Sequence, residues 1–393
     1  MKPLKKYYTY LIRGLNFTFL FILSFIIPKD KNLLLFGDGF KKFNGNSKYL
    51  MMEAAKYKKI KPYFVVKSLN SVPKEYLKNY NFIPSYSIKT FWKILRAKYI
   101  FVNFSGGDIS ITPCIGRFNI VNLWHGTPIK KIGFDSKSMK RKPKSLVEGI
   151  SREILRTSFK NQKMIISMGD FHSKNLKSAF LNKNVVTLGY PRNDILFEKK
   201  FKKDSFLKKM NIQNSKKIFL YVPTYRDDSG EISPFSNNFL EKLNSYLYEN
   251  NYYYLLKTHP SSKKIDIGKF SNIIDVSDSG IPIEELFKLS NVLISDYSSV
   301  YFDFSILKKP MLGYMYDIKD YLKNCRGMYF QIDEELPGPI SYDENELLKN
   351  IKNIERIANS KEYKKEYVEF NKKFNKYLDG NSSKRILKYL KII

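Results

Sequence analysis

Short apolar runs alternate along the chain with longer segments of mixed polarity and helical length. The runs are rich in Val, Ile, Leu, Phe and Tyr and lie at Leu33–Phe36, Tyr63–Val66, Tyr99–Phe104, Asn119–Leu123, Met164–Ser167, Val185–Leu188, Ile218–Val222, Tyr253–Leu256, Asn272–Val276, Val292–Ser295 and Pro310–Tyr314. Continuous apolar runs are typical of buried parallel strands, and their alternation with helices is typical of doubly wound α/β sheets. The lysine-rich stretch Glu198–Lys217 separates the first six runs from the last five. We therefore expect an α/β fold with two Rossmann-like domains, residues 29–197 and 198–393, facing a central cleft.

The first 28 residues depart from this alternation. Four Lys or Arg residues within Met1–Arg13 precede Leu15–Ile27, which is almost wholly apolar. As a helix this apolar stretch measures about 20 Å, short of the roughly 30 Å hydrocarbon core of a bilayer. A cleaved signal peptide has the same order of charged and apolar residues, but Pro28–Lys31 offers no small-residue cleavage site. We expect residues 1–28 to form a membrane-associated helix lying in the interface; a buried helix is the alternative, and whether residues 11–27 span the bilayer stays open.

Composition and charge narrow the class of protein. A hydrophobic content of 43% excludes a disordered chain, and two cysteines exclude a disulfide scaffold and favour the cytosolic side of a membrane. The net charge is +32, and the segment Lys130–Lys163 concentrates it, with eleven Lys or Arg against three acidic residues. A basic surface favours anionic lipid, nucleic acid or phosphorylated ligands. Since the sequence has no zinc-finger spacing, aromatic RNP motif or basic heptad region, we expect an anionic membrane surface and no nucleic acid.

Two of the three histidines directly follow apolar runs. His125 comes after Asn119–Leu123, and His259 comes after Tyr253–Leu256. In open α/β sheets the carboxyl ends of the strands are where ligands bind. A side chain that titrates near neutral pH at such a position indicates proton transfer or phosphate handling. Ordinary loop histidines are the alternative interpretation of each.

The second half contains a candidate phosphate site. The run that ends at Asp296 predicts a strand, Tyr297–Ser299 a turn, and Val300–Leu307 a helix. Serine is a favoured N-cap, and first-turn amides with the helix dipole attract anions, although a serine-capped helix is also common without a ligand. Thr224 and Arg226 follow another predicted strand, and the planar fork of arginine suits phosphate oxygens.

Five ordered motifs together are far more specific than any one of them. They are Trp124-His-Gly-Thr-Pro128, Gly189-Tyr-Pro-Arg-Asn-Asp194, Pro223-Thr-Tyr-Arg-Asp227, Lys257-Thr-His-Pro260, and Ser295-Asp-Tyr-Ser-Ser299 followed by Phe302-Asp303. In these motifs the chain resembles the CDP-glycerol glycerophosphotransferase family, which includes teichoic-acid primases and polymerases and related capsule enzymes. The resemblance runs from about Leu33 to Tyr314. It implies a GT-B-like fold and an enzyme bound peripherally to the cytoplasmic face of the bacterial plasma membrane.

The resemblance also implies the reaction. An alditol phosphate passes from a CDP-activated donor, CDP-glycerol or CDP-ribitol, to a glycan on an undecaprenyl diphosphate lipid, and CMP is released. The compact chain favours transfer of one or a few units. No obligatory metal is expected, because the sequence has neither a P-loop nor a metal-binding Asp-x-Asp, although Mg²⁺ carried by the nucleotide stays open. A nucleotide-sugar GT-B glycosyltransferase and a non-catalytic membrane or nucleic-acid binding protein are the alternatives.

The resemblance assigns roles to matching residues. His125 matches the general base on the acceptor hydroxyl, and Gly126 and Thr127 support it. Arg226, His259, Ser298 and Ser299 match residues around the donor diphosphate, where His259 is expected to be catalytic together with His125. Thr224 is expected to bind the diphosphate beside them. Asp303 matches a motif carboxylate that either holds the phosphate loop or touches the polyol, and Arg192 and Asp194 are expected to pair with each other. The basic residues expected on the acceptor and membrane side are Lys130, Lys131, Lys140, Arg141 and Lys142.

Overall fold

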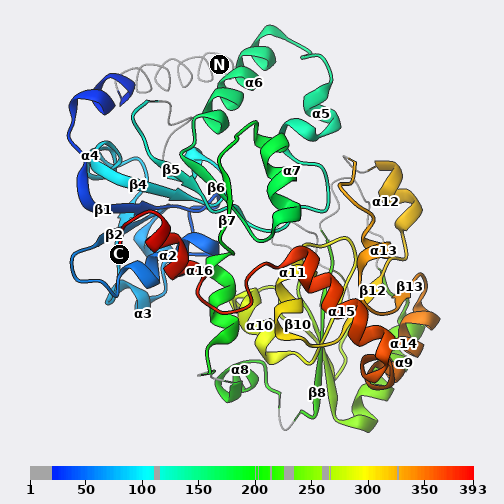
Figure 1. Cartoon of the computed structure of the whole chain (residues 1–393). Helices are drawn as coiled ribbons and strands as arrows, with labels where there is room; N and C mark the ends of the chain where they lie inside the picture. The colour runs from blue at the N-terminus through cyan, green and yellow to red at the C-terminus, as the bar shows by residue number, and fades with distance from the viewer. Residues whose placement is uncertain are drawn as a thin grey trace, which may run out of the picture. The chain divides into compact units, whose positions relative to one another are not determined.

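The chain folds into two compact units, each built on a parallel sheet (Figure 1). The computed structural model describes residues 20–109, 116–199, 201, 203–212, 215–224, 234–258, 265, 267–324 and 327–393. The first unit comprises the described residues up to His125, Ile132–Asp194 and Asn381–Ile393. The second comprises Gly126–Lys131 and the described part of Ile195–Gly380.

The first unit contains a seven-stranded sheet in the order β3-β2-β1-β4-β5-β6-β7, with every neighbouring pair parallel. Its strands are β1 (Asp30–Phe36), β2 (Lys61–Val66), β3 (Asn81–Pro84), β4 (Ala97–Val102), β5 (Ile120–Asn122), β6 (Met164–Ser167) and β7 (Val185–Thr187). Its helices are α2 (Gly45–Ala54), α3 (Lys74–Leu77), α4 (Ile88–Arg96), α5 (Lys137–Lys140), α6 (Leu146–Lys160), α7 (Asp170–Phe180) and α16 (Ser382–Tyr389). The strand order changes direction between β1 and β4, and in folds of this kind ligands bind beyond the carboxyl ends of the strands at such a position.

The second unit contains a six-stranded parallel sheet in the order β10-β9-β8-β11-β12-β13. Its strands are β8 (Lys217–Val222), β9 (Tyr252–Leu256), β10 (Ile273–Asp275), β11 (Val292–Ser295), β12 (Met311–Tyr314) and β13 (Ile340–Ser341). Its helices are α8 (Lys203–Lys209), α9 (Asn237–Asn250), α10 (Ile283–Leu289), α11 (Val300–Phe304), α12 (Ile318–Asn324), α13 (Ile332–Glu335), α14 (Glu344–Asn359) and α15 (Lys361–Phe374). The direction changes here between β8 and β11.

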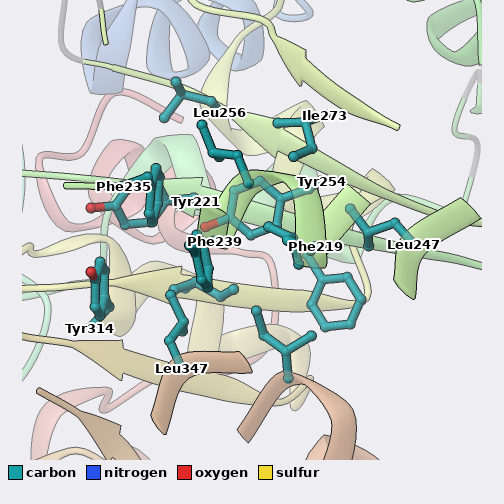
Figure 2. Packing of buried hydrophobic residues seen from close by; sticks show 14 of the residues in the cluster. Phe219, Tyr221, Phe235, Phe239, Leu247, Tyr254, Leu256, Ile273, Tyr314 and Leu347 are labelled. Carbon is teal, nitrogen blue, oxygen red and sulfur yellow. The ribbon is translucent and has the colours of Figure 1, made fainter. Parts of the chain in front are cut away.

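Aromatic side chains fill the core on one face of this second sheet (Figure 2). Tyr221 and Tyr254 lie on adjacent strands and are both buried, and Phe235 stacks on Tyr314 with ring centroids 5.7 Å apart. The hydroxyl of Tyr314 donates a hydrogen bond of 2.7 Å to the carbonyl of Pro234, so this large ring is buried without losing its polar contact. The core thereby fixes the strands whose ends carry the predicted phosphate site.

The α/β fold with parallel sheets is confirmed, and all eleven predicted runs coincide with strands. The two strands that the sequence did not predict, β3 and β13, both lie at sheet edges. An edge strand pairs on one side only and needs no long apolar run. β3 is four residues long, from Asn81 to Pro84, and β13 has two.

The C-terminal helix α16 belongs to the first unit, whereas the predicted boundary placed it with the second domain. The carboxylate of Asp194 accepts hydrogen bonds of 2.8 Å from the amides of Ser382 and Ser383 at the start of α16. Arg385 then donates to the carbonyl of Leu188 at 2.8 Å. These contacts join residues almost 200 positions apart in sequence, so a local pattern could not reveal them.

Most of the predicted membrane-associated helix lies outside the described residues, which begin at Leu20. Residues 20–26 are helical. Leu20 and Ser24 are buried, while Phe21, Ile22, Phe25 and Ile26 are 37–66% exposed. Within the described part of the chain, no helix has both the length and the apolar character needed to cross a bilayer.

Candidate active site

Side chains that follow β1 and β4 bond to one another where the strand order of the first sheet changes direction. Asn103, directly after β4, donates from Nδ2 to Asp38 Oδ1 at 2.9 Å, and its Oδ1 accepts from Ser47 N and Ser47 Oγ at 3.0 and 2.9 Å. Asp108 accepts from the amides of Asn103 and Phe104, both at 2.8 Å. Burial raises the pKa of Asp38 and raises that of Asp108 to about 7. The loop after β4 is therefore fixed by buried polar groups.

His125 follows β5, and its ring packs against the loop after β4. Its ring stacks on Phe104, with centroids 4.0 Å apart, and its Nδ1 is 3.3 Å from the carbonyl oxygen of Asn103. Because a carbonyl only accepts hydrogen bonds, Nδ1 carries the hydrogen, and the neutral ring keeps its lone pair on Nε2. Burial, with a smaller contribution from the nearby positive charge of Arg192, lowers the pKa of His125 from 6.5 to about 4. At neutral pH the ring is therefore uncharged and able to accept a proton at Nε2.

The backbone around His125 is held on both sides. Asn46, in the first turn of α2, donates to the carbonyls of Leu123 at 3.2 Å and Trp124 at 2.7 Å. Arg192 donates from Nη1 to the carbonyl of His125 at 2.8 Å. Arg192 and Asp194, which were expected to pair with each other, thus have separate partners: the His125 peptide and the start of α16.

In the second sheet Asp296 joins the ends of β8 and β11. Its carboxylate accepts from the amide and the hydroxyl of Thr224, which follows β8, and from the amide of Tyr297 at 2.6 Å. These bonds hold Thr224, just after β8, next to the end of β11. Asp296 itself was not singled out from the sequence.

Ser298 and Ser299 follow β11 and are half-buried. The predicted helix Val300–Leu307 consists of α11 and a 3₁₀ turn, η5 (Ser305–Leu307). Ser299 occupies the N-cap position without a side-chain bond to the helix, while Ser298 Oγ accepts from the amide of Val300 at 3.4 Å. Asp303 is only 3% exposed, which fits a residue that supports the loop.

The predicted basic residues divide between the two units. Gly126–Lys131 belongs to the second unit, where Ile129 O accepts from Tyr329 N and Lys131 N donates to Gly327 O, both at 2.8 Å. Thr127 is buried, and Lys130 Nζ lies 4.6 Å from the ring centre of Tyr321. By contrast, Lys140, Arg141 and Lys142 are exposed in the first unit beside α6.

Two predicted donor residues, Arg226 and His259, lie outside the described residues. Their roles, like those of the other site residues, stay predictions. Among the residues that the structure describes, no group of three or more His, Cys, Asp or Glu side chains is arranged to hold a metal ion.

Comparison with known proteins identifies the family. The family model for CDP-glycerol:poly(glycerophosphate) glycerophosphotransferase matches residues 19–391. The chain belongs to this family. The resemblance predicted from the five motifs is thereby confirmed, and the chain is an enzyme of the CDP-glycerol glycerophosphotransferase type.

Similar members of the family act in teichoic acid synthesis. The teichoic acid poly(glycerol phosphate) polymerase of Bacillus spizizenii is 32% identical over 404 residues, which cover 99% of each chain. The teichoic acid glycerol-phosphate transferase of Staphylococcus aureus is 33% identical over 322 residues, covering 78% of this chain and 79% of the relative. Among solved structures, the wall teichoic acid polymerase TagF superposes with a TM-score of 0.78 at 26% identity, covering 93% of this chain and 89% of that one. A TagF variant has also been solved after a soak with CDPG.

Proposed function

We propose that the chain transfers glycerol phosphate from CDP-glycerol to a lipid-linked glycan acceptor in teichoic acid synthesis, with His125 as the general base. The observation that carries this proposal is the state of the His125 ring: Nδ1 is bonded to the Asn103 carbonyl and Nε2 remains the proton acceptor. Family membership and the solved TagF variant soaked with CDPG support CDP-glycerol as the donor. The sequence motifs do not discriminate glycerol from ribitol, so the assay below includes both donors.

The reaction needs one bond formed, one broken and one proton moved. The acceptor hydroxyl attacks the phosphorus that bears the glycerol, its proton passes to Nε2 of His125, and the bond from that phosphorus to the bridging oxygen breaks, so that CMP leaves. Phosphoryl transfer depends mainly on positioning and charge neutralisation. We assign the neutralisation to Arg226 and His259, and the hydroxyl contacts to Ser298 and Ser299. The two serines lie at the direction change of the second sheet, where ligands bind in such folds.

The low pKa of His125 fits a base that is adjusted by its substrate. A pKa of about 4 makes a weak base, since the best general bases have a pKa near the working pH. A base that takes the proton of the attacking hydroxyl must lie close to the donor diphosphate. One negative charge about 6 Å away contributes about 3 kcal/mol at an effective dielectric constant of about 20, which raises a pKa by about two. Donor binding therefore brings His125 into the useful range.

We propose that the enzyme needs no protein-bound metal and that Mg²⁺ enters, where used, on the donor diphosphate. The sequence has no P-loop and no metal-binding Asp-x-Asp. The positive charge in the proposed site comes instead from Arg226 and from His259 in its protonated form.

We also propose that the chain binds peripherally to the cytoplasmic leaflet, where an undecaprenyl-diphosphate-linked acceptor would be presented. Helix α6 exposes a stripe of apolar side chains: Leu146 (80%), Val147 (68%), Ile150 (53%), Ile154 (42%) and Leu155 (37%). The basic residues of and after α5, Lys140 to Lys144, are exposed next to it in sequence. An apolar stripe flanked by lysines is typical of helices that lie in a membrane interface, and each lysine near an anionic surface contributes about 1 kcal/mol.

The test is a transfer assay on the full chain with lipid-linked disaccharide in vesicles. We expect CMP release and a new phosphodiester in the lipid product with CDP-glycerol, and a comparison with CDP-ribitol identifies the preferred donor. A glycosidic bond in the product would support the nucleotide-sugar glycosyltransferase instead. Absence of CMP release with both donors and several acceptors would contradict the proposal.

A further inference from the structure

Asn46, in the first turn of α2, bonds to two segments that contact each other at His125: Leu123–Trp124 and the backbone of Arg192. Asn46 is fully buried, its Nδ2 donates to the carbonyls of Leu123 and Trp124, and its Oδ1 accepts from the amide of Arg192 at 3.0 Å. We propose that Asn46 is a positioning residue of the transfer reaction and acts through the peptide that carries His125. This inference rests on the proposed role of His125 as the base.

Ser47, the next residue of α2, holds Asn103, whose carbonyl is the hydrogen-bond partner of the His125 ring. Ser47 bonds through its amide and its hydroxyl to Asn103 Oδ1, and the carbonyl of Asn103 accepts from His125 Nδ1. Space here is tight: a Cβ on Gly45 would lie 2.6 Å from Asn103 Nδ2, and Gly45 has a φ of 65°. Asn46 therefore fixes the backbone that carries the His125 ring, and Ser47 fixes the residue whose carbonyl sets the tautomer of that ring.

The segment that Asn46 holds adopts an unfavourable backbone conformation. Trp124 has a φ of 53°, in the left-handed region that bulky side chains avoid. Such a conformation persists only where surrounding contacts impose it. The bonds from Asn46 to the carbonyls of Leu123 and Trp124 are two of these contacts. Without them we expect the Trp124 backbone to relax and the His125 ring to move.

A displaced base affects turnover more than donor binding. A general base works only within hydrogen-bond reach of the proton, and a misplacement of about 1 Å costs about 10²-fold in rate. We expect Asn46→Ala to lower kcat by about 10²-fold and to leave KM for CDP-glycerol within about twofold. Asn46→Asp keeps the volume and the acceptor for the Arg192 amide, but it cannot donate to two carbonyls. It should lower kcat by a similar factor with KM again within about twofold, and a kcat close to that of the unchanged enzyme in either folded variant would contradict the inference.

Asn182 provides a matched control in the same unit. It is also buried, its Nδ2 donates to the carbonyls of Phe159 and Gln162, both at 2.9 Å, and its Oδ1 accepts from the amide of Asn184 at 2.8 Å. The bonding pattern equals that of Asn46, but no carbonyl it holds lies next to His125. Asn182→Ala should therefore lower Tm about as much as Asn46→Ala does and leave kcat within about twofold.

The double variant shows whether Asn46 acts through the base. In single-turnover measurements, Asn46→Ala should cause a loss of about 10²-fold in the otherwise unchanged enzyme and almost no further loss in His125→Ala. A full additional loss in the His125→Ala background, or equal effects of Asn46→Ala and Asn182→Ala on kcat, would overturn the inference. If His125→Ala itself turned over normally, the proposed role of His125 would fail first. That outcome is distinguishable, because it needs no Asn46 variant.

Discussion

The protonation state of His125 can be measured directly through the pH dependence of turnover. In the ligand-free enzyme, burial and Arg192 lower the pKa of His125 from 6.5 to about 4, which corresponds to about 3 kcal/mol against the charged ring. At pH 5.5 a histidine with a pKa of about 4 is about 97% neutral, whereas one with the ordinary pKa is about 9% neutral. We therefore expect kcat/KM, which reports the free enzyme, to be nearly unchanged between pH 7.5 and 5.5 as far as His125 is concerned.

The donor should move this titration upward. Because kcat reports the enzyme–substrate complex, its acid limb should lie about two pH units above that of kcat/KM if the diphosphate comes within about 6 Å of the ring. The sign is fixed by the chemistry: protonation removes the Nε2 lone pair, so activity falls as pH falls. Equal acid limbs in the two profiles would contradict the proposed adjustment of the base by its substrate.

Histidine NMR measures the protonation state of the His125 ring without turnover. The chain has three histidines, so two single substitutions assign the signals. In ¹⁵N spectra of the ligand-free protein, we expect His125 to show a protonated Nδ1 and a bare Nε2 from pH 7.5 down to about pH 5. A titration of His125 near 6.5, or a hydrogen on Nε2 at neutral pH, would refute the assignment of the base.

Folding stability is a poorer probe of this group. A histidine whose pKa is lowered by folding stabilises the protein above pH 6.5, and this contribution is lost as pH falls from 6.5 to about 4. Asp108 acts in the opposite direction, because its raised pKa of about 7 means that the folded state takes up a proton first as pH falls. Since the two effects overlap in pH and oppose each other, activity and NMR separate them while a melting curve does not.

Three further outcomes follow from the site and the proposed membrane face. His125→Ala should lower kcat by about 10²–10⁴-fold with the fold retained, measured by CMP release and thermal denaturation, and normal turnover would contradict its role as the base. Arg226→Lys should raise KM for CDP-glycerol, because a point charge cannot replace a bidentate fork; unchanged donor kinetics would remove Arg226 from the site. Ile150→Glu should weaken cosedimentation with anionic vesicles and leave Tm almost unchanged, since Ile150 is 53% exposed, whereas equal binding would argue against α6 as the membrane face.

Burial explains how far the fold could be predicted from sequence. Strands covered on both faces, such as β8 and β11, are marked by continuous apolar runs, so their existence follows from composition alone. The edge strands β3 and β13 carry no such run. The return of α16 to the first unit depends on Asp194 meeting two amides far along the chain, and no spacing rule predicts that contact.

His125, Thr224 and Ser298 were singled out from the sequence because each lies just after an apolar run. The sequence gives no comparable signal for Asn46 and Asn103. Asn46 lies in a segment, Gly45-Asn-Ser-Lys48, that looks like an ordinary turn and helix start, and Asn103 lies inside the predicted run Tyr99–Phe104. Their importance arises only when the sheet brings the ends of β1, β4 and β5 together. The basic residues Lys130 and Lys131 were grouped with Lys140 by proximity in sequence, yet the backbone bonds of Lys131 lie in the second unit.

Both sheets have a buried carboxylate where the strand order changes direction, but the residues around the two carboxylates differ. At each change of strand direction the ends of two strands diverge, and a buried carboxylate closes the gap: Asp38 bonded to Asn103 in the first unit, and Asp296 bonded to Thr224 in the second. In the first unit the Asn103 side chain bonds to that carboxylate. The main-chain carbonyl of Asn103 accepts from Nδ1 of His125, which follows β5, and so sets the tautomer of the ring. In the second unit the carboxylate ties back the loop, and Ser298 and Ser299 stay half-buried beside α11. The first arrangement leaves a neutral His125 ring, and the second leaves the hydroxyls of Ser298 and Ser299 just after β11. In the proposed function the ring takes the proton of the acceptor and the hydroxyls contact the donor diphosphate.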